Sequence, residues 1–305
     1  MKQINYLVGN SKFSSNPFEP FSNEVCNFLN DLSDELNNLK TIKEYSDLKA
    51  LSFWCRRKNI LKLKENFNSQ KNRIGLGMVF HITPANIPTN FVYSLIFGLL
   101  TGNSNIVKVP SKNFEEINII CSLINKILKK KNSFLKNKIT IIKYKDNNEF
   151  TKKISLSCSA RVIWGGDQTI NNLRDFKIKE RTVEITFADR YSFCVMDPAK
   201  VKKMSDYELN NLVQRFYNDT YLVDQNACSS PHLILWLGRK TKNSNDKFWN
   251  KLHNLVKKKY KFTESAPVEK YTDLCKYILS TNNIKNIKKF ENLIYKIKLK
   301  KVDQN

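Results

Sequence analysis

One of the seven cysteines stands in a segment that could support chemistry. Cys228 lies in Asp224-Gln-Asn-Ala-Cys-Ser-Ser-Pro231, a run of small and polar residues between a predicted helix and a predicted strand. Backbone N–H groups in such a loop can favour a thiolate and receive an oxyanion. Cys228 is therefore a candidate nucleophile, and a loop thiol without a chemical role is the alternative. The other six lie in apolar or helical surroundings, which predicts buried, unreactive thiols: Cys26, Cys55, Cys121, Cys158, Cys194 and Cys275.

A second candidate is an asparagine held between two prolines. Asn86 lies in Pro84-Ala-Asn-Ile-Pro88, directly after a predicted strand. Ligands bind at that edge of a parallel sheet, and an oxyanion hole requires a rigidly placed side-chain amide. Capping of the turn is the alternative role for this asparagine. His81 is predicted at the same edge, either as a hydrogen-bonded strand-end histidine or as polar lining of a site.

Two glycines form the third candidate. Gly165 and Gly166 follow a predicted strand at residues 161–164 and lead into a helix, an arrangement that lets backbone approach a phosphate. The signal is weak by itself because paired glycines are common in turns. The sequence contains neither GxGxxG nor GxxxxGK[ST].

The elements that must position these residues alternate between strands and helices. Helices are predicted in the first 70 residues and at residues 88–101, 114–128 and 206–221, with Gly102 as a C-terminal cap. The predicted strands cover residues 74–82, 105–109, 139–144, 161–164, 182–187, 192–197 and 233–237. This order predicts an α/β fold with a parallel sheet covered on both faces.

The charge is strongly positive but unevenly distributed. Lys and Arg number 52 against 28 Asp and Glu, and only nine of the 52 are Arg. Residues 239–305 hold 18 basic and six acidic residues and are predicted to be helical. Proteins that read bases favour Arg, and the sequence offers no nucleic-acid-binding motif. A nucleic-acid-binding function is therefore the least favoured of the three functions considered. The surplus of Lys indicates a solvated surface.

Several other classes are disfavoured. No CxxC pair exists and the three histidines are scattered, so no metal site is expected. The longest apolar run, at residues 91–100, is about half of what a membrane crossing requires. Residues 1–10 lack the apolar core of a signal peptide. An odd number of cysteines without such a signal predicts reduced thiols and a cytoplasmic location.

Five segments carry a resemblance to a known family. They are Pro84-Ala-Asn-Ile-Pro88, Leu95-Ile-Phe-Gly-Leu-Leu-Thr-Gly-Asn-Ser-Asn-Ile-Val-Lys-Val-Pro-Ser111, Trp164-Gly-Gly-Asp167, Arg190-Tyr-Ser-Phe193 and Asp224-Gln-Asn-Ala-Cys-Ser-Ser-Pro231. In this order they resemble the LuxC-type acyl-CoA reductases of the aldehyde dehydrogenase superfamily, over residues 74–237. The resemblance implies an aldehyde-dehydrogenase-like α/β fold, with a Rossmann-type parallel-sheet cofactor domain and an incomplete catalytic lobe.

The resemblance assigns a role to each matching residue. Cys228 matches the nucleophile and Asn86 the side-chain donor of the oxyanion hole. Lys108 and Ser111 match the pair that meets the adenosine ribose. Gly165 and Gly166 match the loop against the dinucleotide phosphates.

Two details refine the implied reaction. Superfamily members that prefer NAD usually carry an acidic residue where Ser111 stands, so NADPH is the expected cofactor. Hydrolytic members use a glutamate to activate water. Counting back from Arg190 places Thr186 there, and Glu184 restores the base if the register differs. Without a base, water attacks the thioester slowly and the acyl group survives for hydride transfer.

The implied function is NADPH-dependent reduction of a fatty acyl thioester, carried by CoA or a protein, to an aldehyde. An acyl-protein synthetase or acyltransferase subunit and a second copy of the chain are the implied partners. Only 77 residues follow Cys228, fewer than in the family, and no family motif is found beyond residue 238. We expect an N-terminal helical region with the NADP-binding domain at residues 1–197, and a shortened cysteine lobe at residues 198–305. A non-catalytic acyl- or nucleotide-binding protein is the main alternative.

Overall fold

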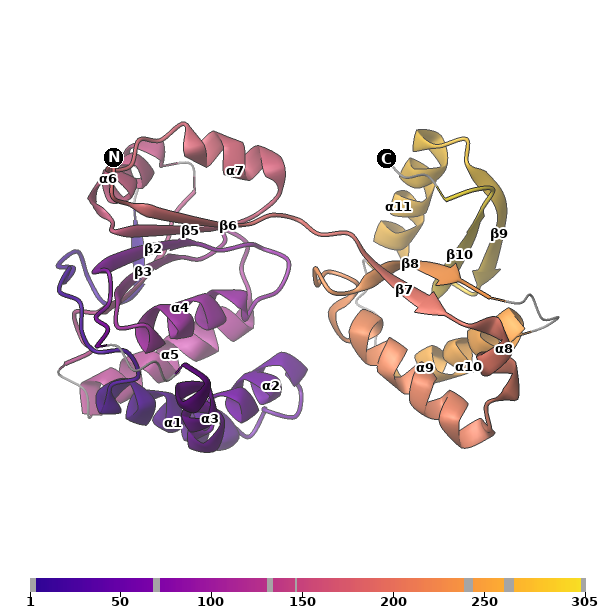
Figure 1. Ribbon diagram of the computed structural model, residues 1–305, viewed down its shortest axis with the longest axis horizontal. Coiled ribbons are helices and arrows are strands. Elements are labelled where there is room, and N and C mark those ends of the chain that lie inside the picture. The colour runs from indigo at the N-terminus through magenta and orange to yellow at the C-terminus, as the bar shows by residue number, and fades with distance from the viewer. Residues whose placement is uncertain are drawn as a thin grey trace. The chain divides into compact units, whose positions relative to one another are not determined.

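The protein is described by a computed structural model that covers residues 4–67, 72–130, 134–145, 147–238, 244–260 and 266–302. It divides into two compact units, Met1–Asp189 and Arg190–Asn305 (Figure 1). The division falls earlier than the predicted boundary after residue 197. The reason is that strand β7 (Ser192–Met196) pairs in parallel with β8 (Pro231–Trp236) in the second unit and does not extend the first sheet.

The first unit is built on a six-stranded sheet in the order β1-β4-β3-β2-β5-β6. β1 (Asn5–Val8), which the sequence did not predict, is antiparallel to β4, and the other neighbours are parallel. The remaining strands are β2 (Met78–Ile82), β3 (Ser104–Lys108), β4 (Ile139–Lys143), β5 (Ala160–Trp164) and β6 (Val183–Phe187). This confirms the predicted parallel α/β fold, with β2 starting later than expected.

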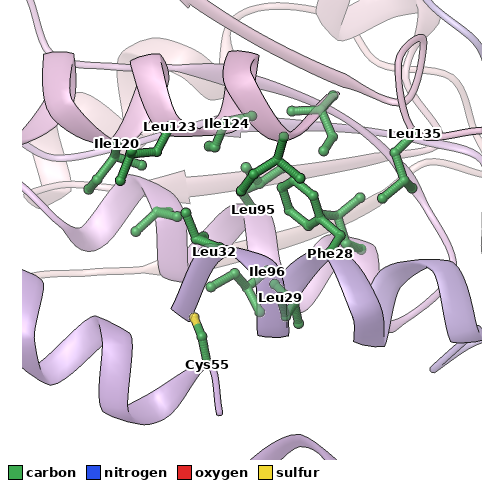
Figure 2. Packing of buried hydrophobic residues seen from close by; sticks show 14 of the residues in the cluster. Phe28, Leu29, Leu32, Cys55, Leu95, Ile96, Ile120, Leu123, Ile124 and Leu135 are labelled. Atoms are coloured by element: carbon green, nitrogen blue, oxygen red, sulfur yellow. The ribbon is translucent and has the colours of Figure 1, made fainter. Parts of the chain in front are cut away.

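Helices cover both faces of this sheet (Figure 1). α4 (Asn90–Leu100) and α5 (Glu115–Lys130) lie on one face, and α6 (Asn148–Ser157) and α7 (Asp167–Arg174) on the other. α1 (Asn23–Asn37), α2 (Ser46–Trp54) and α3 (Arg57–Phe67) pack against α4 and α5 in one large apolar cluster. Phe28, Leu32, Leu95 and Ile124 meet in this cluster (Figure 2).

The predicted cap of α4 is present. Gly102 has a φ of 82°, and its N–H donates to the carbonyl of Leu99 over 2.9 Å. A left-handed residue at a helix end satisfies carbonyls that have no intrahelical partner, and glycine adopts this conformation without a steric cost. The cap turns the chain directly into β3.

The described part of the second unit contains the two-stranded parallel sheet, four helices and a C-terminal two-stranded sheet. The helices are α8 (Pro198–Lys203), α9 (Asp206–Thr220), α10 (Ser244–Lys259) and α11 (Ala266–Ser280), and a 3₁₀ turn, η1 (Tyr221–Val223), follows α9. Its core joins Met196 of β7 to Phe216 of α9 and Phe248 of α10.

The expectation of a helical basic C-terminus is correct for α10 and α11 and wrong for the residues that follow them. After α10 and α11 the chain forms a hairpin of β9 (Ile284–Phe290) and β10 (Ile294–Leu299). Apolar and lysine side chains alternate from Tyr295 to Leu299, and this period of two is typical of a strand. The predicted segment also includes residues 239–243, 261–265 and 303–305, which lie outside the described residues.

Neither a membrane-spanning helix nor a metal cluster is present among the described residues. No helix among them combines the length and apolar character needed to cross a membrane. Within the same residues, no group of three or more His, Cys, Asp or Glu side chains is arranged to hold a metal ion.

Candidate active site

The candidate cofactor residues gather at the carboxyl edge of the first unit's sheet. β3 and β4 extend from one side of β2, and β5 and β6 from the other, so the strand order reverses between β2 and β5. Ligands of open parallel sheets bind at such a reversal. The loops after β2 and β3 are tied together, because the backbone N–H and the hydroxyl of Thr83 both donate to the carbonyl of Lys108, over 3.2 and 2.9 Å.

Asn86 lies exposed in the loop after β2. Its Oδ1 accepts a hydrogen bond from the backbone N–H of Ile87 over 3.0 Å. The turn-capping role predicted as the alternative is therefore present. With Oδ1 engaged in this bond, the donor of the amide is Nδ2, the kind of atom that an oxyanion requires.

Gly165 and Gly166 lead from β5 into α7 beside the strand reversal. The N–H of Gly165 donates to the carbonyl of Phe187 over 3.2 Å, and the carbonyl of Gly166 accepts the first helical bond, from Ile170, over 3.1 Å. A Cβ on Gly166 would meet nothing within 4 Å, so the backbone there is open to a close approach. This opening at the start of a helix fits a phosphate.

Two lysines at strand ends, Lys108 of β3 and Lys143 of β4, lie beside the loop after β3. Lys108 is half-buried, with Nζ 5.1 Å from the centroid of the Tyr144 ring. Ser111 is exposed in the loop. Lys143, at the end of β4, donates to the carbonyl of Lys112 over 3.4 Å and to the side-chain oxygen of Asn113. Lys143 was missed from the sequence because its proximity depends on the pairing of β3 with β4.

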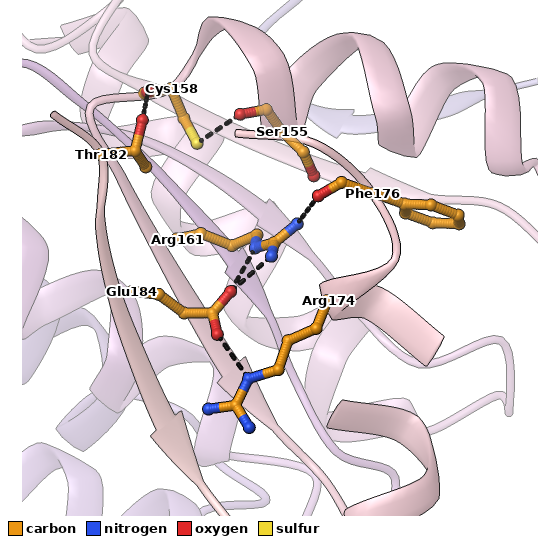
Figure 3. A network of polar contacts seen from close by, with 7 residues as sticks. All are labelled: Ser155, Cys158, Arg161, Arg174, Phe176, Thr182 and Glu184. Carbon is orange, nitrogen blue, oxygen red and sulfur yellow. Dashed lines mark hydrogen bonds and ion pairs between the residues drawn. The ribbon is translucent and has the colours of Figure 1, made fainter. Parts of the chain in front are cut away.

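Glu184 is engaged in an ion-pair network (Figure 3). One carboxylate oxygen accepts from the buried guanidinium of Arg161, and the other accepts from Arg174 Nε over 2.9 Å. Arg161 also donates to the carbonyl of Phe176 over 3.1 Å. Burial opposes ionisation of Glu184, but the two arginines outweigh it and lower the carboxyl pKa. An ionised carboxylate held by two arginines is a poor general base, which argues against the alternative assignment of Glu184.

Thr186 shares the face of β6 that carries Glu184, two residues earlier. Its hydroxyl is not a base at neutral pH. The described strand therefore presents no free carboxylate at these two positions.

Cys228 lies in the second unit, in the loop between α9 and β8. It is exposed, and its carbonyl accepts a hydrogen bond from Ser192 Oγ over 2.6 Å. The preceding residues Asp224 and Gln225 have φ values of 50° and 56°, a left-handed conformation that costs energy for residues with a Cβ. Burial raises the pKa of the Asp224 carboxyl against the opposing charge of Lys270.

Four of the other cysteines are buried as predicted, whereas Cys194 and Cys275 are only half-buried. All seven lie within the described residues, and Cys228 alone is exposed. Burial raises the pKa of Cys55 and Cys121 to about 12 and that of Cys158 to about 11, so these thiols stay protonated. Burial also raises the pKa of Cys26 and Cys194.

The structure thus places the predicted residues in two groups. The first unit carries Asn86, Lys108, Ser111, Gly165 and Gly166 at one sheet edge, and the second unit carries Cys228. A family model described as acyl-CoA reductase (LuxC) matches residues 32–270, which include both groups. The chain belongs to this family.

Several solved structures that are similar to this LuxC-family chain are aldehyde dehydrogenases. Lactaldehyde dehydrogenase from Escherichia coli matches with a TM-score of 0.58 and 13% identity, over 87% of this chain and 60% of that one. Aldehyde dehydrogenase 21 from Physcomitrella patens, in complex with succinate, gives 0.59 and 14%, over 89% and 62%. Betaine aldehyde dehydrogenase from Staphylococcus aureus, in complex with NAD+, gives 0.55 and 16%, over 88% and 58%.

These likenesses establish an aldehyde-dehydrogenase-like fold. The LuxC-family chain spans about 60% of the length of the lactaldehyde dehydrogenase it matches. No curated protein matches the sequence.

Proposed function

We propose that this LuxC-family protein reduces a fatty acyl thioester to an aldehyde through an acyl-enzyme on Cys228, with NADPH as the reductant. One observation carries the proposal. Cys228 is the exposed cysteine among seven, and it stands in a strained polar loop within the segment matched by the family model. The acyl donor is an acyl-CoA or an acyl-protein, delivered in the second case by an acyl-protein synthetase or acyltransferase.

The proposed first half-reaction uses the sulfur of Cys228. Its thiolate attacks the thioester carbonyl, and the bond from the acyl carbon to the donor sulfur breaks as the donor thiol leaves with a proton. The negative charge that develops on the carbonyl oxygen requires N–H donors. Asn86 Nδ2 is the proposed side-chain donor, and its Oδ1 is already committed to Ile87.

The second half-reaction needs a reductant. A reduced nicotinamide cofactor, when bound, supplies a hydride to the acyl carbon. The thiohemiacetal on Cys228 then releases the aldehyde as its carbon–sulfur bond breaks and the thiolate is restored. Thr186 cannot activate water, and Glu184 is held by Arg161 and Arg174, so both residues leave the thioester intact for reduction.

The residues at the sheet edge fit a dinucleotide with a 2′-phosphate. The open backbone at Gly166 suits the phosphates, and Lys108 with Ser111 suits the adenosine ribose. Lys143 lies against the same loop, where its ammonium is held by the carbonyl of Lys112 and the side chain of Asn113. An ammonium near a neutral serine favours a phosphate on the ribose, and we therefore propose NADPH over NADH.

The proposal is tested by following Cys228 directly. The protein is incubated with a panel of acyl-CoAs, and its intact mass and acylated peptide are determined, followed by NADPH consumption. We expect a single acyl adduct on Cys228 that disappears when NADPH is added. The Cys228→Ser variant should form no adduct, and Cys194→Ser, which changes a half-buried cysteine of the same unit, should form it normally.

Other outcomes separate the alternatives. An adduct that forms on Cys228 without any NADPH consumption favours the non-catalytic acyl-binding protein. A Cys228→Ser protein that is still acylated at this peptide contradicts the assignment of the nucleophile.

A further inference from the structure

A hydrogen-bond chain of polar side chains runs through the first unit from Asn105 of β3 to Trp164 at the end of β5. His81 of β2 is buried between α4 and β3, with Nδ1 2.8 Å from Ser94 Oγ and Nε2 2.9 Å from Asn105 Oδ1. Trp164, the last residue of β5, donates its indole N–H to the same Ser94 hydroxyl over 3.1 Å. The proposed reaction uses none of these side chains.

The partners in the hydrogen-bond chain determine which atom of each pair carries the hydrogen. Asn105 Nδ2 donates to the carbonyl of Asn103 over 2.7 Å, so Asn105 Oδ1 is an acceptor and His81 Nε2 must carry a hydrogen. In a neutral imidazole Nδ1 is then an acceptor, and Ser94 donates its hydroxyl hydrogen to it. The Ser94 oxygen remains to accept from Trp164.

The surroundings hold His81 in that neutral form. Burial lowers its pKa from 6.5 to about 4, more than the hydrogen bond to Asn105 raises it. Gly98 of α4 packs directly against two members of the hydrogen-bond chain, because a Cβ there would lie 1.8 Å from Asn105 Oδ1 and 3.0 Å from His81 Nε2. The absence of a side chain at Gly98 lets α4 pack closely enough for Ser94 to reach His81.

The hydrogen-bond chain ends at Trp164, the residue directly before the Gly165-Gly166 loop. The Trp164 ring stacks on Phe187 of β6, with centroids 4.0 Å apart and planes 14° apart, and the next residue, Gly165, bonds to the carbonyl of Phe187. Stacking alone leaves a ring free to slide in its plane, whereas the bond to Ser94 fixes the edge of the indole. Trp164 is thereby held on two sides.

We propose that His81 and Ser94 are positioning residues for the Gly165-Gly166 loop, acting through the hydrogen-bond chain that ends on the Trp164 indole. The ring of Trp164 fixes where the loop leaves β5, and therefore where its backbone meets a ligand. The proposal rests on the proposed function in one respect: this loop is the proposed contact for the dinucleotide phosphates.

The test uses two variants and a matched control in the full chain. Ser94→Ala removes the hydroxyl in the middle of the hydrogen-bond chain. Trp164→Phe keeps a stacked aromatic ring but removes the indole N–H. Ser52→Ala is the control, because Ser52 is also a buried helical serine, whose hydroxyl donates to the carbonyl of Ser33 over 3.2 Å. Amide hydrogen exchange of Gly165, the NMR signal of the Trp164 indole N–H, and the Kd for NADPH are measured in each.

We expect the Gly165 amide to exchange about tenfold faster in Ser94→Ala and Trp164→Phe than in the wild type, with no change in Ser52→Ala. The NMR signal of the Trp164 indole N–H should shift in Ser94→Ala and stay unchanged in Ser52→Ala. The Kd for NADPH should rise about tenfold in Ser94→Ala and in Trp164→Phe.

Unchanged amide exchange at Gly165 in both Ser94→Ala and Trp164→Phe overturns the positioning role. An equal rise in the Ser52→Ala control also overturns it, because the effect is then a general loss of stability. If the wild-type protein does not bind NADPH, the proposed function fails, and the exchange rates still decide whether the chain positions the loop.

Discussion

The two units pack their sheets in different ways. In the first, six strands are covered by helices on both faces, and Phe28 and Leu32 in the main cluster have no exposed surface. In the second, two parallel strands pack one face on α9 and α10 through Cys194 and Met196. The alternate residues Phe193 and Val195 keep 58% and 54% of their surface exposed.

This difference shows how the proposed chemistry divides. The cofactor residues occupy an edge fixed by a packed sheet, by the pair of bonds from Thr83 to Lys108, and by the chain from His81 to Trp164. The nucleophile occupies a loop with two consecutive left-handed residues, Asp224 and Gln225, beside a sheet with one apolar face exposed. A rigid binding edge and a strained loop are expected to respond differently to substitution.

The largest contrast is expected between two phenylalanines. Phe28→Ala should lower the free energy of unfolding of the first unit by about 3–5 kcal/mol, because it leaves a cavity in a close-packed core. Phe193→Ala should cost the second unit less than about 1 kcal/mol, because that ring is already exposed. Urea titration followed by hydrogen exchange in each unit measures both values. Equal losses would show that the exposed face of β7 is covered in solution.

The ion-pair network should give the next largest effect. Glu184→Gln leaves the buried guanidinium of Arg161 without its opposite charge and should cost the first unit about 3 kcal/mol. The exposed substitution Glu65→Gln should change stability by no more than about 0.5 kcal/mol. If Glu184→Gln also slowed hydrolysis of the Cys228 thioester, the exclusion of Glu184 as the base would be wrong.

The stability of the first unit should depend on pH through His81. The folded state keeps His81 neutral, with a pKa of about 4, whereas the unfolded chain takes up a proton below pH 6.5. The stability that depends on neutral His81 is thus complete above pH 6.5 and is lost as the pH falls towards 4. Between pH 6.5 and 5 the loss should reach about 2 kcal/mol.

His81→Gln, which does not titrate, provides the comparison for that measurement. The slope of unfolding free energy against pH in the first unit should be smaller for this variant than for the wild type. Equal slopes in this window would show that His81 is not held neutral by the fold.

The smallest effect concerns cofactor choice at the rigid edge. Lys143→Ala should raise the Kd for NADPH about tenfold and leave the Kd for NADH unchanged, because only the 2′-phosphate needs the ammonium. Fluorescence titration with both cofactors measures the ratio. The exposed Lys153 of α6, on the other side of the sheet, supplies the control Lys153→Ala, which should change neither Kd. An equal loss for both cofactors in Lys143→Ala would contradict the proposed 2′-phosphate contact.

Local sequence patterns predicted most of the first unit. The apolar spacing from Ile117 to Leu128 marked α5, and short β-branched runs ending at Pro110 and Gly165 marked β3 and β5. These patterns depend on which side chains face the core, and the sequence states that directly. The loops that follow the strands, and with them the candidate cofactor residues, could therefore be placed at one edge.

Features that depend on pairing between distant segments were not predicted. β6 and β7 follow one another in sequence, yet they join different sheets, which moved the unit boundary to residue 189. The partnership of Arg161 with Glu184 follows from the register of β5 against β6. Ser94 carried no signal at all, because a serine in an apolar helix shows its role only when His81 and Trp164 are seen to reach it.

The measurement that tests the central claim most directly is the mass of the protein after a single turnover. Wild-type protein mixed with one equivalent of a long-chain acyl-CoA should gain the mass of the acyl group at Cys228, and addition of NADPH should remove that mass and release one equivalent of fatty aldehyde. Release of the free fatty acid, or an acyl group found on any other residue, would contradict the account.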